Sequence, residues 1–191
     1  LAVGDFDGDG IPDLAVAGPN MGLRQYQGLG NGQFAAVTSL PELDSPACGN
    51  GGDNFPQPAF FLQTFRPAGR TRDLLVAAHG EGCSQLWVLA SGVDGRLAIS
   101  STLTNLDVNA LAVGPVLQAR SGGLPDLITT SLDGGYLEVR RFLAGSLSFE
   151  NAPAVTLSIA GGPRSIKLVD WDGDGWNDVA VLNRYFDRVA L

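Results

Sequence analysis

Two nine-residue segments rich in aspartate are the parts of this sequence most capable of chemistry. Asp-Phe-Asp-Gly-Asp-Gly-Ile-Pro-Asp occupies residues 5–13, and Asp-Trp-Asp-Gly-Asp-Gly-Trp-Asn-Asp occupies residues 170–178. Both have carboxylates at positions 1, 3, 5 and 9 and a glycine at position 6, where the backbone can turn sharply. Calcium takes six to eight oxygen ligands, so carboxylates that alternate along a tight turn can converge on one ion. The sequence therefore predicts two Ca²⁺ sites.

We expect each ion to be held by the four carboxylates and by the backbone carbonyl at position 7. The expected ligands are Asp5, Asp7, Asp9, the Ile11 carbonyl and Asp13 in the first segment, and Asp170, Asp172, Asp174, the Trp176 carbonyl and Asp178 in the second. An EF-hand is excluded because position 12 is a valine within a strand-like run, where that loop requires glutamate. The alternative is a metal-free Asp/Gly surface turn, in which four close carboxylates would repel one another.

The residue at position 9 belongs to a motif that recurs along the whole chain. The aligned residues, each followed by a short apolar run, are Asp13, Asp73, Asp126 and Asp178. They are 60, 53 and 52 residues apart. Each unit reads as four short strands with Gly-rich turns between them, and the 26 glycines and 11 prolines disfavour long helices.

We predict an all-β fold, a β-propeller of four-stranded antiparallel blades. The approximate repeats are residues 1–57, 58–107, 108–163 and 164–191, of which the last is incomplete, so the chain holds about three and a half blades. A β-sandwich would not explain the period. Propellers close with four to eight blades, and open blade edges invite aggregation. We therefore expect a longer polypeptide with the remaining blades, or a partner chain that covers the edges.

The combination of Asp-x-Asp-Gly-Asp-Gly-x-x-Asp with a following Leu/Val-Ala-Val resembles the FG-GAP repeat, also called the VCBS-type or integrin α-like repeat. The resemblance implies a propeller, usually seven-bladed, in extracellular or cell-surface proteins, with structural calcium in the loop between the first two strands of a blade. Only the first and fourth units carry the full motif. In the second unit Phe65, Pro67 and Gly69 replace the first three carboxylates, and the third unit has no carboxylate before Asp126. We expect no calcium there, with Arg70 or Arg120 in place of the cation.

The net charge, the hydropathy and the cysteine content indicate which classes of partner and which cellular location to expect. The net charge of −8 argues against nucleic acid, and eight of the 20 acidic residues lie in the two Asp-rich segments. No apolar run is long enough to cross a bilayer, so we expect no membrane insertion. The two cysteines, Cys48 and Cys83, are typical of an exported chain with one disulfide. We therefore expect an extracellular, cell-surface or periplasmic location.

The leading functional hypothesis is a non-enzymatic, calcium-stabilised extracellular module that binds a protein or glycan, as in cell adhesion. The alternatives are the propeller of a secreted polysaccharide-acting enzyme, such as a lyase, or a lectin. His79 is the single histidine and has no Ser or Cys motif to pair with, so we predict no catalytic residue. Trp171 and Trp176 flank expected calcium ligands and could shield the metal loop or stack on a sugar ring.

Overall fold

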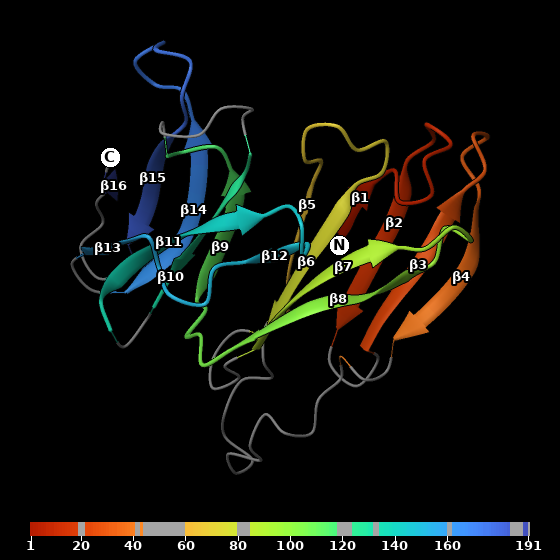
Figure 1. The fold of residues 1–191 in the computed structure, drawn as a ribbon, viewed down its shortest axis with the longest axis horizontal. Coiled ribbons are helices and arrows are strands. Elements are labelled where there is room, and N and C mark those ends of the chain that lie inside the picture. Colours follow the sequence, from red (N-terminus) through yellow and green to blue (C-terminus); the bar gives the residue numbers. More distant parts are fainter. Residues whose placement is uncertain are drawn as a thin grey trace. The chain divides into compact units, whose positions relative to one another are not determined.

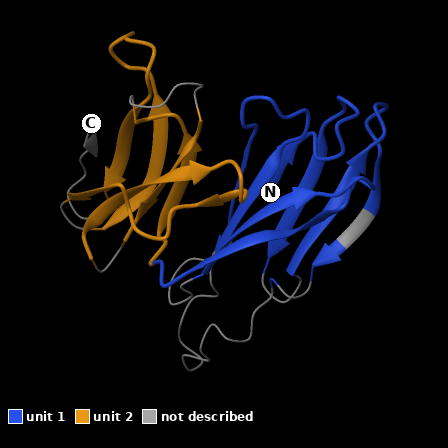
Figure 2. Cartoon of the chain, in the orientation of Figure 1, with its two compact units in different colours: residues 1–106 blue, residues 107–191 orange. Residues whose placement is uncertain are grey.

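The computed structural model describes residues 1–18, 22–40, 43, 60–79, 85–117, 124–131, 134–159, 162–183 and 189–190. These residues contain sixteen β-strands, which are arranged in four antiparallel sheets (Figure 1). The chain divides into two compact units, residues 1–106 and residues 107–191 (Figure 2). No helix within the described ranges is long and apolar enough to span a membrane.

The first sheet has the strand order β1-β2-β3-β4, which is also the chain order. Its strands are β1 (Ala2–Gly4), β2 (Asp13–Gly18), β3 (Gly22–Gly28) and β4 (Phe34–Leu40). Gly4 pairs with Asp13 across β1 and β2, so the first Asp-rich segment is the connection between these two strands. The alternating burial of β2, with Asp13 and Ala15 buried, reflects the two-residue period of a strand whose one face packs on a core.

The second sheet repeats this order and completes the first unit. Its strands are β5 (Phe60–Phe65), β6 (Leu74–His79), β7 (Gln85–Ser91) and β8 (Leu97–Thr104). The central strands β6 and β7 are rich in Leu, Val and Ala and are buried on both faces. One hydrophobic cluster joins the two sheets of this unit; among its members are Phe6, Leu23, Leu75, Trp87 and Leu89.

A buried glutamine also connects these two sheets. Gln25 of β3 is 1% exposed, and its side-chain amide donates to the Gly95 carbonyl at 2.8 Å. Its side-chain oxygen accepts the Leu97 backbone N–H at the same distance. A buried amide needs such partners, because an unpaired donor or acceptor in the core costs about 1–3 kcal/mol.

The second unit contains the third and fourth sheets. The third has β9 (Ala110–Gly114), β10 (Asp126–Thr130), β11 (Tyr136–Leu143), β12 (Ser148–Phe149) and β13 (Val155–Ser158), with both β12 and β13 paired to β11. The fourth has β14 (Pro163–Val169), β15 (Asp178–Asn183) and β16 (Val189–Ala190). A cluster that includes Ala112, Ile128, Val139, Ile166 and Val181 forms the core between these two sheets.

The all-β expectation and the four-stranded antiparallel sheets are confirmed, with one difference in the third sheet. There the expected outer strand is divided into β12 and β13, which pair with opposite ends of β11. Pro153 lies between the two pieces, and proline has no N–H to donate to a strand partner. Cys48 and Cys83, and therefore the expected disulfide, lie outside the described residues, as does the side chain of His79.

Candidate metal centres

The two Asp-rich segments, which we call loop 1 (residues 5–13) and loop 2 (residues 170–178), occupy equivalent places in two sheets. Loop 1 connects β1 to β2 and loop 2 connects β14 to β15. In each loop, the residue at position 9 pairs with the last residue of the preceding strand. The glycines at positions 4 and 6 have φ between 79° and 91° in both loops. This left-handed conformation is strained for any residue with a Cβ, which explains why both positions are glycine.

The two loops share one pattern of hydrogen bonds from backbone to carboxylate. The position 1 carboxylate accepts the N–H groups of positions 4 and 6, at 2.7 and 3.2 Å in loop 1 and at 2.8 and 2.9 Å in loop 2. The carboxylates at positions 3 and 5 each accept the N–H two residues further on, at 2.7–3.1 Å, as in Asx turns. The position 9 carboxylate accepts the position 2 N–H at 2.8 Å in loop 1 and 2.9 Å in loop 2. The loop conformation is therefore encoded by its own nine residues.

Three carboxylates in each loop come close enough to share an ion. The groups are Asp5, Asp7 and Asp13 in loop 1, and Asp170, Asp172 and Asp174 in loop 2; within each group one oxygen per residue lies within 4.8 Å of the others. Two oxygens that each lie 2.3–2.6 Å from one Ca²⁺ are at most about 5 Å apart, so both groups fit this ion. The donors are all hard oxygens, the kind that calcium prefers.

The remaining expected ligands have other contacts. Asp9 and Asp178 lie outside the two close groups; Asp9 accepts the Ile11 N–H at 2.7 Å, and Asp178 accepts the Trp171 N–H at 2.9 Å. The ligand roles of all ten expected residues, including the Ile11 and Trp176 carbonyls, stay predictions.

Asp13 closes loop 1 from a fully buried position. Its side chain is 0% exposed, and its two oxygens accept the N–H groups of Phe6 at 2.8 Å and Gly28 at 2.9 Å. Burial raises the pKa of the Asp13 carboxyl above its ordinary value, while the two N–H donors act in the opposite direction. Asp13 is therefore a structural anchor of the loop as well as a candidate ligand.

Two side chains that were not singled out from the sequence contact the carboxylates of loop 1. Gln27 of β3 donates its amide N–H to Asp7 at 2.6 Å. Arg66, which follows β5, places Nε 2.7 Å from Asp73 Oδ1 and Nη2 3.4 Å from Asp5 Oδ2. The hydrogen bond to Asp73 raises the pKa of the Arg66 guanidinium further above its already high value, so this group is charged. The sequence did contain a signal for Arg66. It is a basic residue at position 2 of the second unit, where the first three carboxylates are missing.

The second sheet packs closely against loop 1. The Phe6 side chain is 0% exposed within the shared core, and its carbonyl accepts a hydrogen bond from the Ser91 hydroxyl. Gly95, in the turn between β7 and β8, has φ +75°, and a Cβ there would lie 2.6 Å from Asp7 Cβ. The Arg72 side chain lies beside Gly8 and donates to the Gly92 carbonyl. One side of loop 1 is thus covered by residues that are 60 to 90 positions away in the chain, while residues 8–10 and 12 are exposed.

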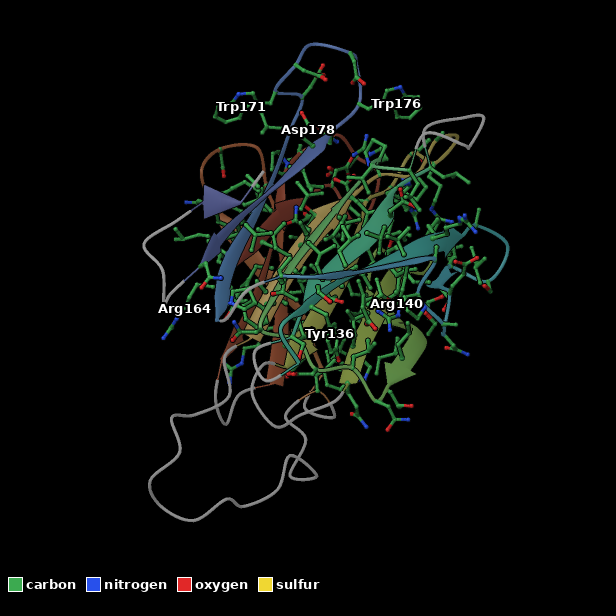
Figure 3. All side chains as sticks on the ribbon, turned by 90° about the vertical axis from the view of Figure 1, so that its left-hand side faces the viewer. Tyr136, Arg140, Arg164, Trp171, Trp176 and Asp178 are labelled. Carbon is green, nitrogen blue, oxygen red and sulfur yellow. The ribbon has the colours of Figure 1, made fainter. Side chains whose placement is uncertain are left out.

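Loop 2 is much more exposed. Its residues 170–175 are all exposed, and Trp171, the equivalent of Phe6, is 68% exposed. The loop projects beyond the ends of β14 and β15 (Figure 1), and the labelled indoles of Trp171 and Trp176 lie on opposite sides of it (Figure 3). A hydrogen bond from the Asn177 side chain to the Pro115 carbonyl, at 3.1 Å, ties its base to the third sheet.

The aligned aspartates of the second and third units keep a loop-holding role. Asp126 is buried and accepts the N–H groups of Val116 and Leu117 at 3.1 and 3.0 Å. Asp73 accepts the Asp5 N–H at 2.7 Å and the Arg66 bond given above. Arg66 therefore balances the charge of Asp73, the expectation for Arg70 stays a prediction, and Arg120 lies outside the described residues. The position 9 aspartate is useful to the fold even where the other carboxylates are missing.

Comparisons with known proteins agree with this architecture. A family model described as an FG-GAP-like repeat matches residues 5–56 and 123–181. A solved structure described as BBS1N in complex with ARL6DN, soaked with lead, matches with a TM-score of 0.55 at 12% identity. The match covers 96% of this chain and 51% of that chain, so this chain spans about half the length of that neighbour. No curated protein sequence matches. At this identity the likeness concerns the fold alone, and it agrees with a β-propeller built from four-stranded blades.

Proposed function

Because the chain belongs to the FG-GAP-like repeat family, we propose that it is a non-enzymatic, calcium-stabilised propeller module that binds partners outside the cell. The family is generally non-catalytic and typical of extracellular proteins. The observation that carries the proposal is the gathering of three carboxylate oxygens within 4.8 Å, in two loops with the same hydrogen-bond pattern. Asp5, Asp7 and Asp13 would hold one Ca²⁺, and Asp170, Asp172 and Asp174 the other, with Asp9, Asp178 and the position 7 carbonyls as further ligands.

The chemistry that calcium supplies here is charge neutralisation. Each loop holds four carboxylates in nine residues, and their mutual repulsion favours unfolding of the turn unless a cation is bound. Because the loops join the first two strands of their sheets, an ion in the loop would stabilise the start of the blade. In this proposal calcium has a structural role in the fold of the module.

Calcium titration of the full chain tests the proposal. Isothermal calorimetry of protein stripped with EDTA should show two sites for Ca²⁺ and much weaker binding of Mg²⁺, which retains its waters. A hundredfold excess of Ca²⁺ over the dissociation constant stabilises the folded state by about 2.7 kcal/mol per site, which raises the melting temperature by roughly 5–10 °C. Absence of binding heat together with an unchanged melting temperature would overturn the calcium proposal.

A glycan is the partner class that one specific observation favours. Trp171 exposes 68% of its surface beside the loop 2 carboxylates, and exposed indoles stack on the apolar faces of sugars. Binding on a glycan array that is lost both in EDTA and in Trp171→Ala would support a lectin-like role. Binding that survives Trp171→Ala would place the glycan elsewhere, and a negative array would leave a protein partner as the proposed ligand.

A further inference from the structure

Arg66 lies at the junction between loop 1 and the second sheet. Its guanidinium spans two carboxylates, with Nε 2.7 Å from Asp73 Oδ1 and Nη2 3.4 Å from Asp5 Oδ2. The same two aspartates are joined by backbone bonds, because the Asp5 N–H donates to Asp73 Oδ2 at 2.7 Å and the Asp73 N–H donates to the Asp5 carbonyl at 2.8 Å. Two contacts therefore hold the guanidinium beside the first residue of loop 1, and two backbone bonds hold Asp5 and Asp73 together.

This position puts a permanent positive charge next to a candidate calcium ligand. Asp5 is one of the three residues whose oxygens come within 4.8 Å of one another. A neighbouring cation reduces the repulsion between these carboxylates when no metal is bound, and it repels Ca²⁺ when the metal approaches. The two effects come from the same charge and act in opposite directions on calcium affinity and on metal-free stability.

Loop 2 provides an internal reference without such a charge. It has the same backbone hydrogen bonds as loop 1, yet no Arg or Lys in the described parts of the chain forms an ion pair with Asp170, Asp172 or Asp174. The loops therefore differ in their surroundings, and the main ionic difference is the pairing of Arg66 with Asp5 at loop 1.

We propose that Arg66 is a built-in counter-charge of loop 1, which keeps the loop folded without metal and lowers its affinity for Ca²⁺. This inference rests on the proposed calcium binding. Arg66 acts through Asp5 and is not itself a ligand. Loop 1 then depends less on calcium than its four carboxylates alone would require.

The test isolates loop 1 and then removes the charge. Asp172→Asn with Asp174→Asn silences loop 2 in the full chain, so that calorimetry reads loop 1 alone. In this background Arg66→Gln should tighten Ca²⁺ binding roughly 3- to 10-fold at low ionic strength, and 1 M salt should remove most of the gain because it screens the charge. The same variant should lower the melting temperature in EDTA, an effect opposite in sign to the gain in affinity.

Two control variants separate charge from shape. Arg66→Lys keeps the positive charge without the two-pronged geometry, so its calcium affinity should stay within about twofold of the parent. Arg141→Gln removes an arginine of similar exposure, 41% against 45%, which pairs with Glu150 in the third sheet, and it should leave the affinity unchanged. A folded Arg66→Gln protein with unchanged or weaker calcium binding would overturn the role of Arg66 alone. No calcium binding at either loop of the unmodified chain would overturn the proposed function, and this inference with it.

Discussion

Loops 1 and 2 share their pattern of backbone hydrogen bonds but lie in two different surroundings. Both turn through left-handed glycines and bond their carboxylates to the same backbone N–H groups. Loop 1 is covered on one side by the second sheet and neutralised in part by Arg66, whereas residues 170–175 of loop 2 are all exposed. The nine residues of a loop therefore determine its backbone conformation, while its burial and charge balance are determined by distant parts of the chain.

The largest expected difference concerns position 2. Phe6→Ala should lower the free energy of unfolding by about 3–5 kcal/mol, because it removes a fully buried ring from the core shared by two sheets. Trp171→Ala, at the equivalent exposed position, should change it by less than about 0.5 kcal/mol. Urea denaturation followed by circular dichroism measures both. Equal losses in the two variants would contradict the difference in burial between the loops.

An intermediate effect is expected where the second sheet approaches loop 1. Gly95→Ala would place a Cβ 2.6 Å from Asp7 Cβ at a positive φ, which should cost about 2–3 kcal/mol and weaken calcium binding at loop 1. Gly32→Ala is the matched control, since Gly32 has φ +81° and an added Cβ there meets nothing within 4 Å. Its cost should be only that of the backbone, about 1 kcal/mol. Thermal unfolding with and without calcium compares the two, and a Gly95→Ala protein as stable as Gly32→Ala would argue against close packing.

The smallest expected difference in stability is between variants of the two position 9 aspartates, Asp13 and Asp178. Asp13→Asn should lower the stability of the metal-free protein by about 1–2 kcal/mol, because an amide can accept only one of the two buried N–H groups that now bond to the carboxylate. Asp178→Asn should cost less than 1 kcal/mol, because Asp178 is partly exposed and water can replace a lost partner. Urea denaturation in EDTA measures both, and a larger loss of stability in Asp178→Asn than in Asp13→Asn would contradict the deeper burial of Asp13.

The pH dependence of the Asp13→Asn effect gives a further check with a defined sign. Burial raises the folded-state pKa of Asp13 above the ordinary 3.8, so the folded state binds this proton more tightly than the unfolded state. The stability contributed by Asp13 is then complete below pH 3.8 and falls as the pH rises through the folded-state pKa. Since asparagine does not titrate, the destabilisation by Asp13→Asn in metal-free protein should shrink with rising pH, and growth over that range would contradict the shift.

The fold was largely predictable from the sequence because its signals are local. The strand after each aligned aspartate, the amphipathic third strands and the Gly-rich turns before Phe34 and Leu97 lie where short-range patterns place them. The matching sequences of the two loops are likewise reflected in their shared backbone hydrogen bonds, but they do not explain why positions 1, 3 and 9 come together in loop 1 and positions 1, 3 and 5 in loop 2. The division of the third sheet's outer strand was not predicted, although Pro153 was visible as a strand breaker.

The surroundings of the loops could not be predicted from local sequence patterns. The contacts of Arg66 with Asp5 and of Ser91 with Phe6 join residues 61 and 85 positions apart, and no local pattern encodes which sheets meet. The sequence indicated a guanidinium near the missing carboxylates of the second unit, but it did not single out Arg66. Only the packing of one sheet on another decides which nearby guanidinium reaches the carboxylates.

Gln25 has a consequence for how such repeats can be recombined. Its side-chain amide bonds one carbonyl and one N–H of the turn and strand that include Gly95 and Leu97, much as a peptide group does in a strand ladder. A slide of the second sheet by one residue would break both bonds at once, so Gln25 works as an alignment key between neighbouring repeats. A chimaera that joins the first repeat to a different second repeat should therefore assemble well only if the new repeat has a carbonyl and an N–H at the positions of Gly95 and Leu97.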